Sequence, residues 1–187
     1  MEVKEREMTD YTMRPVGTSQ AKGLVDMIVA CYDILKKPLR VLEIGSYRGE
    51  STQILLQTGF IESITCIDAW ENGYDDDDAA SYTAPMSRVE KQFDEHVAPY
   101  KNVTKIKGKS GDVVGQFEDG TFDLIYIDGD HRYEGCKSDI INFLPKIKNG
   151  GVIAGHDGHH PPIRKAIADT IGKVDQEFVD TSWLKKV

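Results

Sequence analysis

Residues 39–49 read LRVLEIGSYRG, a short apolar run that stops at Gly45 and meets a second glycine at Gly49. A run of this length and composition is typical of a strand buried on both faces. A helical pattern follows from about residue 50 to residue 58, and Gly59 stands in the C-terminal cap position. A buried strand that turns at glycine into a helix is the opening unit of an α/β fold.

The same alternation of strands and helices continues along the chain. Further strands are predicted at 63–68, 103–107, 122–128, 151–155, 177–179 and 183–187. Helices are predicted from Ser19 to Leu35, from about 85 to 97, from 133 to 144 and from 161 to 171. This order predicts an α/β, Rossmann-like, doubly wound and mostly parallel seven-stranded sheet with helices on both faces.

Length and composition predict one domain over residues 1–187, since 40% hydrophobic residues can build a core. Within it we expect an N-terminal cap segment and helix at 1–38. The aperiodic stretch at 70–84 contains four consecutive aspartates and is expected to form a lid loop on the ligand side of the sheet.

The charge and the cysteines of the sequence exclude several kinds of partner and of structural cross-link. The formal net charge of -8 repels polyanions, so no nucleic-acid partner is expected. The three cysteines are widely spaced and show no CxxC pair, which argues against a disulfide framework and a zinc cluster. The charged start and the lack of a long apolar run predict a cytoplasmic protein with no membrane partner.

Residues at the carboxyl ends of the predicted strands form a pattern for binding a nucleoside, because ligands of open α/β sheets lie at that edge. Gly45 and Gly49 lack the middle glycine of a GxGxxG loop, which disfavours a pyrophosphate. Asp68 ends the second strand, where a carboxylate accepts hydrogen bonds from ribose hydroxyls. Ser110 follows the third strand, where it could meet an adenine amino group.

These residues, with DGDHRY at 128–133 and GGVIAGHD at 150–157, resemble the class I S-adenosylmethionine-dependent methyltransferases. The closer resemblance is to the branch of macrocin-type sugar O-methyltransferases and cephalosporin-hydroxylase-like proteins, over about residues 39–187. It implies S-adenosyl-L-methionine as cofactor, with its ribose on Asp68 and its adenine near Ser110. The expected contacts of the methionine part are Glu43, Gly45, Ser46 and Gly49, and further expected cofactor contacts are Ala69, Trp70 and Asp128.

Acids and histidines follow the fourth and fifth strands, which should be neighbours. The resemblance implies that Asp128, His156 and Asp157 are metal ligands, and that His131 is a catalytic base beside Asp128. The branch has a carboxylate where His156 stands, and magnesium prefers oxygen ligands. The choice among Mg, Mn, Fe and Zn therefore stays open, as does the alternative that Asp128 only caps a helix.

The sequence thus predicts an enzyme that O-methylates a small hydroxylated acceptor of sugar or natural-product type, with a divalent metal assisting. Two alternatives are a nonmethylating enzyme of the same fold, either hydroxylase-like or an NAD-dependent oxidoreductase, and a nucleoside-binding regulatory module. His131 favours an enzyme, because a module that only binds needs no base there. The identity of the acceptor and the formation of a homo-oligomer stay open.

Overall fold

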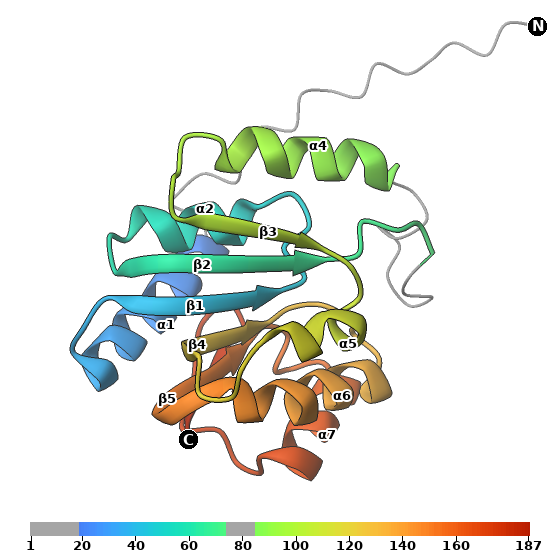
Figure 1. Ribbon diagram of the computed structural model, residues 1–187. Coiled ribbons are helices and arrows are strands. Elements are labelled where there is room, and N and C mark those ends of the chain that lie inside the picture. The colour runs from blue at the N-terminus through green and yellow to red at the C-terminus, as the bar shows by residue number, and fades with distance from the viewer. Residues whose placement is uncertain (1–18, 74–84) are drawn as a thin grey trace, which may run out of the picture.

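The computed structural model describes residues 19–73 and 85–187 (Figure 1). The N-terminal part of the expected cap segment and residues 74–84 of the expected lid lie outside these ranges. The elements in chain order are α1 (Ser19–Leu35), β1 (Leu39–Ile44), α2 (Glu50–Gln57), β2 (Ile61–Asp68), α4 (Met86–Val97), β3 (Val103–Lys107), α5 (Ser110–Val113), the 3-10 helix η1 (Val114–Gln116), β4 (Phe122–Ile127), α6 (Tyr133–Phe143), the 3-10 helix η2 (Leu144–Lys146), β5 (Ile147–Gly155), α7 (Pro161–Thr170), β6 (Gln176–Glu177) and β7 (Trp183–Lys186).

The described strands form one seven-stranded sheet in the order β3-β2-β1-β4-β5-β7-β6. Strands β1 to β5 pair in parallel, whereas β7 is antiparallel to both β5 and β6. The predicted mostly parallel seven-stranded sheet is confirmed. Strand β1 pairs with β2 on one side and β4 on the other, so the strand order reverses between β1 and β4. The carboxyl ends of these two strands therefore open the crevice in which such folds bind ligands.

Alternating side chains of the central strands enter two cores, one on each face of the sheet. Val41 and Leu124 pack with α1, α2 and α4, whereas Leu42, Ile125 and Ile153 pack with α6 and α7. Figure 1 shows these two groups of helices on opposite faces of the sheet. Fully burying each aliphatic side chain contributes about 1.5–3 kcal/mol, so both layers hold the strand ends in place.

Helix α1 is amphipathic, as its sequence predicts. Its buried residues Met27, Ile28 and Cys31 pack on the sheet, while Lys22 and Asp26 form an ion pair on the exposed side. With 17 residues it is shorter than the roughly 20 that span a bilayer. None of the described helices has both the length and the apolar character needed to cross a membrane.

Besides shifts of one or two residues at the ends of β2, β4, β6 and β7, two segments differ more clearly from the sequence predictions. Strand β5 begins at Ile147, four residues before the predicted start, because its register with β4 shifts and accommodates Gly150 at φ 78°. No element was predicted directly after the third strand, but the residues that follow β3 form the short helix α5. Four residues are too few to show a helical hydrophobic period, which is why the sequence gives no signal for α5.

Candidate active site

A cavity of about 550 Å³ lies at the carboxyl edge of the parallel strands. This size lies within the usual range for small-molecule and cofactor sites. Loops after all five parallel strands contribute to its lining, including Gly45, Asp68, Ala69, Ser110, Asp128, His131, His156 and Asp157. The predicted site residues in this list therefore come together, although they are separated by more than a hundred positions in the chain.

Gly45 lets the loop after β1 pass directly against the chain after β4. Its backbone N–H donates to Ile67 O at 2.9 Å, and its φ of 87° lies in the left-handed region. A Cβ at this position would lie only 2.0 Å from the backbone oxygen of Asp128. The absence of a side chain is therefore required for the crevice between β1 and β4.

Glu43 and Ser46 are predicted to contact the methionine part of the cofactor; the structure places both behind this loop, and neither is among the residues that line the cavity. The fully buried Glu43 carboxylate accepts hydrogen bonds from Ser46 Oγ at 2.7 Å and Ser51 Oγ at 2.6 Å, and also from Thr52 Oγ1. Burial raises the pKa of Glu43, while these hydroxyl groups oppose the shift. Both residues therefore tie the loop to α2.

Gly49 also lies away from the cavity. It precedes α2 at φ 81°, and a Cβ there would lie 3.0 Å from the ring of Phe93. Its left-handed backbone lets the chain enter α2, and its predicted contact with the cofactor stays a prediction.

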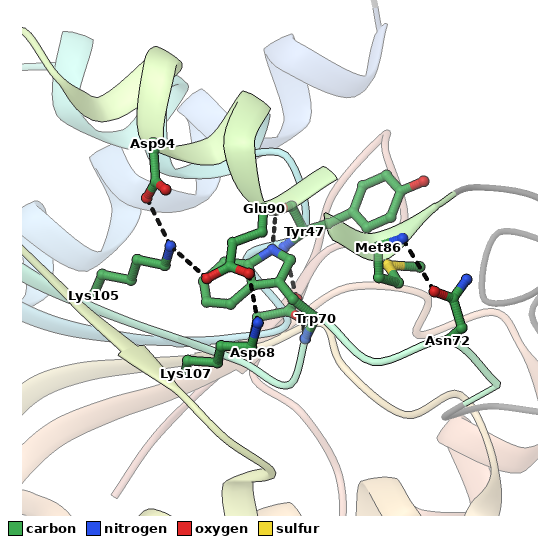
Figure 2. A network of polar contacts seen from close by, with 9 residues as sticks. All are labelled: Tyr47, Asp68, Trp70, Asn72, Met86, Glu90, Asp94, Lys105 and Lys107. Carbon is green, nitrogen blue, oxygen red and sulfur yellow. Dashed lines mark hydrogen bonds and ion pairs between the residues drawn. The ribbon is translucent and has the colours of Figure 1, made fainter. Parts of the chain in front are cut away.

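Asp68 presents a carboxylate that two backbone N–H groups hold in a fixed orientation (Figure 2). Tyr47 N donates to Oδ2 at 2.8 Å, and Trp70 N donates to Oδ1 at 2.7 Å. Tyr47 and Trp70 have φ angles of 45° and 43°, an uncommon conformation for residues other than glycine, asparagine and aspartate. Burial raises the pKa of Asp68, and the two backbone hydrogen bonds lower it. Each oxygen keeps acceptor capacity for one more donor.

Trp70, which is predicted to contact the cofactor, supports this arrangement from the core and is not among the residues that line the cavity. Its side chain is buried against Phe93, and its indole Nε1–H donates to Tyr47 O at 2.8 Å. Lys105 Nζ lies 4.7 Å from the centre of the ring, and Glu90 bridges Lys105 and Lys107 at 2.8 and 2.5 Å (Figure 2). These contacts hold α4 against β3 and keep the indole in place next to the loop after β1.

Ser110 Oγ donates a hydrogen bond of 2.5 Å to Asp139 Oδ1 on α6, and both residues line the cavity. Burial and the charge of Asp130 raise the pKa of Asp139 to about 6, while Ser110 opposes the shift. Sequence reasoning missed Asp139. The available signal is an acid inside the apolar stripe formed by Cys136, Ile140 and Phe143, where a buried helix face should carry a hydrophobe.

Two acids and two histidines cluster at the β4 and β5 side of the cavity. Asp157 Oδ2 lies 3.3 Å from His131 Nε2 and 3.2 Å from His156 Nδ1, and His156 Nδ1 lies 3.9 Å from Asp128 Oδ1. Burial and the charge of Asp157 raise the pKa of Asp128 to about 7, against the opposing effect of the histidines. Burial would lower the pKa of His156, but its hydrogen bond to Asp157 and the charge of Asp128 raise it to about 9.

One ligand atom each from Asp128, His131 and Asp157 lies within 4.8 Å of the other two, which is a spacing that could hold a metal ion. The expected set contained His156 in place of His131. Among the described residues, the group with this spacing therefore includes His131, which was expected to be the catalytic base.

Comparisons with known proteins assign the family. Residues 42–158 match the family model for a methyltransferase domain. Together with the sheet order and the crevice, this match defines a class I S-adenosylmethionine-dependent methyltransferase, and the chain belongs to this methyltransferase-domain family. The finding supports the predicted methyltransferase over the NAD-dependent oxidoreductase.

Individual relatives are distant. The chain is 25% identical over 126 residues to the uncharacterized protein y4gI of Sinorhizobium fredii (strain NBRC 101917 / NGR234), and the match covers 65% of this chain but only 13% of that protein. The structure of the O-methyltransferase NovP is similar with a TM-score of 0.62 at 16% identity, covering 94% of this chain and 82% of NovP. CalS11, a TDP-rhamnose 3'-O-methyltransferase of calicheamicin biosynthesis, has a TM-score of 0.60 at 15% identity, covering 93% and 81%. At these identities the two structures show the shared fold alone.

Proposed function

We propose that this methyltransferase transfers a methyl group to a hydroxyl of a small acceptor of sugar or natural-product type, assisted by a divalent cation. The observation that carries the proposal is the grouping of Asp128, His131 and Asp157 in the same cavity as the Asp68 carboxylate. NovP and CalS11, which have this fold, are O-methyltransferases, and the latter is named for a nucleotide sugar.

The residues on the β1, β2 and β3 side of the cavity bind and orient the cofactor in this proposal. Asp68 accepts hydrogen bonds from the ribose hydroxyls, using the capacity that its two backbone donors leave free. Ile44 and Ile67 give the cavity apolar surface. S-Adenosyl-L-methionine supplies the activated methyl group, and fixing it beside the acceptor converts the transfer into an effectively unimolecular step.

The acid and histidine cluster fits a divalent cation. Its two carboxylates and one imidazole offer mixed oxygen and nitrogen ligation, which favours manganese, iron or zinc over magnesium. A cation bound there would act as a Lewis acid that lowers the pKa of an acceptor hydroxyl. His156 lies against both acids and keeps Asp157 ionised and oriented.

The contact between His131 and Asp157 supports a second role for His131. In this arrangement Asp157 orients the imidazole through the 3.3 Å contact, and the ring takes the proton of the acceptor hydroxyl. This role needs no metal ion, so the two mechanisms give opposite responses to chelation.

Removing divalent ions is expected to abolish methyl transfer while cofactor binding stays unchanged. The protein would be treated with a chelator and assayed with methyl-labelled S-adenosyl-L-methionine against a panel of nucleotide sugars and glycosides. Losing the Lewis acid should lower turnover by about 100-fold or more. Adding back manganese, iron or zinc should restore turnover, and affinity for S-adenosylhomocysteine should not change.

Two outcomes would count against the proposal. Full turnover after chelation, combined with its loss in His131→Ala, would assign the base role to His131 and remove the metal from the reaction. Methyl transfer to amines or carbon acids of the panel, with none to its hydroxyl compounds, would reject O-methylation.

A further inference from the structure

We infer that Trp183 is a positioning residue, which holds the Asp157 carboxylate in the orientation that methyl transfer requires. The inference rests on the proposed role of Asp157 in the reaction. Trp183 begins β7 and lies outside residues 42–158, which match the family model. It is not among the residues that line the cavity, so any effect that it has on the reaction passes through another residue.

The Trp183 indole lies along the stretch of backbone that carries Asp157. A Cβ at Gly155 would lie 2.6 Å from indole Cζ2, and a Cβ at Gly158 would lie 3.0 Å from indole Cδ1. The two ends of the ring system therefore face the residues before and after the pair formed by His156 and Asp157. Only 1% of Trp183 is exposed, and it packs in the core that contains α6 and α7. Glycine at both positions allows this close approach of the ring to the backbone.

A hydrogen bond from the indole fixes the peptide group that precedes Asp157. Trp183 Nε1–H donates to the carbonyl oxygen of His156 at 3.1 Å. This oxygen belongs to the planar peptide group that joins His156 to Asp157, so the hydrogen bond restrains rotation about the N–Cα bond of Asp157. Asp157 has a φ of 55°, and such left-handed conformations persist where the surrounding structure holds them.

Two backbone hydrogen bonds hold the chain on either side of this peptide group. His156 N donates to Ile127 O at the end of β4, and Gly158 N donates to Thr181 O before β7, both at 3.0 Å. They fix the two flanking N–H groups, and the indole fixes the carbonyl between them. Together these contacts determine where the Asp157 carboxylate points.

The position of this carboxylate matters because one of its oxygens makes two contacts in the cluster. Asp157 Oδ2 lies 3.3 Å from His131 Nε2 and 3.2 Å from His156 Nδ1. Without the indole N–H, the His156 carbonyl loses this donor and the peptide group can rotate toward another one. A misplacement of a reacting group by about 1 Å can lower a rate by about 100-fold, so a modest rotation should be visible in turnover.

The test compares the unmodified protein with Trp183→Phe, Asp157→Asn and the double variant. Phenylalanine keeps an aromatic ring in the core but lacks the N–H. Trp183→Phe should lower kcat by about 10-fold or more, and it should weaken the binding of manganese alone, measured by electron paramagnetic resonance, by about 10-fold. Affinity for S-adenosylhomocysteine should change by less than about twofold, because Asp68 lies at the end of β2, three strands from β5.

The double variant separates positioning of Asp157 from general support of the fold. In the Asp157→Asn background the carboxylate charge is already absent, so adding Trp183→Phe should lower kcat by less than about threefold. Leu184→Ala is the matched control, since Leu184 is the next residue of β7, is also 1% exposed and packs in the core on the opposite face of the sheet. It should lower the melting temperature but leave kcat within about twofold.

Three results would overturn the inference. One is unchanged kcat and manganese affinity in Trp183→Phe, the second is an equal loss of kcat with and without the Asp157 carboxylate, and the third is an equal loss in Leu184→Ala. If Trp183→Phe does not fold, Trp183→3-benzothienylalanine takes its place with the same expected results, because it keeps the ring shape with sulfur instead of N–H. If the unmodified protein binds no manganese, the metal in the proposed function is rejected, and the comparison of kcat values decides on Trp183.

Discussion

Replacing Asp157 with asparagine is expected to lower kcat by about 10²–10⁴-fold, the range for losing acid-base or metal assistance. Asp157 Oδ2 contacts both His131 and His156, so Asp157→Asn removes the negative charge from both contacts. Asparagine has almost the same shape and tolerates the φ of 55° at this position, so the backbone should be preserved. Turnover is measured with methyl-labelled S-adenosyl-L-methionine at saturation.

The matched control is His159→Ala, which removes an exposed imidazole two positions away and should leave kcat within about twofold. In Asp157→Asn the dissociation constant of S-adenosylhomocysteine should change by less than about threefold, because the contacts of Asp68 and Ser110 are untouched. The account expects Asp157→Asn to lose about 10²-fold or more of kcat. If this variant instead keeps more than about one third of kcat, the cluster takes no part in the chemical step.

Replacing Asp68 with asparagine should weaken the binding of S-adenosylhomocysteine by about 100-fold or more. Hydrogen bonds to a charged group contribute about 1.5–3 kcal/mol each, and the carboxylate is positioned to accept two from the ribose. The amide also cannot accept from both Tyr47 N and Trp70 N, so the loop that presents the side chain loses a contact. Calorimetric titration measures the effect, and kcat at saturating cofactor should change much less.

Asp112→Asn is the control for this variant, because Asp112 is an exposed acid close to the site that does not line the cavity. Its affinity for S-adenosylhomocysteine should match that of the unmodified protein. If Asp68→Asn and Asp112→Asn bind the ligand equally well, Asp68 does not hold the ribose.

The strands and the ligand edge could be predicted from the sequence because their signals are local. The run at 39–44 is apolar throughout and stops at Gly45, and β1 has the predicted bounds. Asp68 directly follows a β-branched run, and its position at the carboxyl end of β2 follows from that. The start of β5 could not be predicted, because Gly150 suggests a turn and the register shift that absorbs it depends on pairing with β4.

The roles of individual side chains were harder to predict, because they depend on contacts between distant segments. Glu43 occupies a core position of β1, and its burial against α2 becomes visible only in three dimensions. Trp70 reads as a residue of an open loop, but its packing on Phe93 of α4 places it in the core. Which imidazole joins Asp128 and Asp157 depends on the path of the turn after β4, since His131 and His156 are 25 residues apart.

The central claim is that one adenosyl group occupies the crevice between β1 and β4, and calorimetric titration with S-adenosylhomocysteine tests it most directly. We expect a saturable heat of binding with one site per chain, and no comparable heat with NAD under the same conditions. Binding of NAD without binding of S-adenosylhomocysteine would contradict the account, because the loop from Gly45 to Gly49 would then be holding a pyrophosphate.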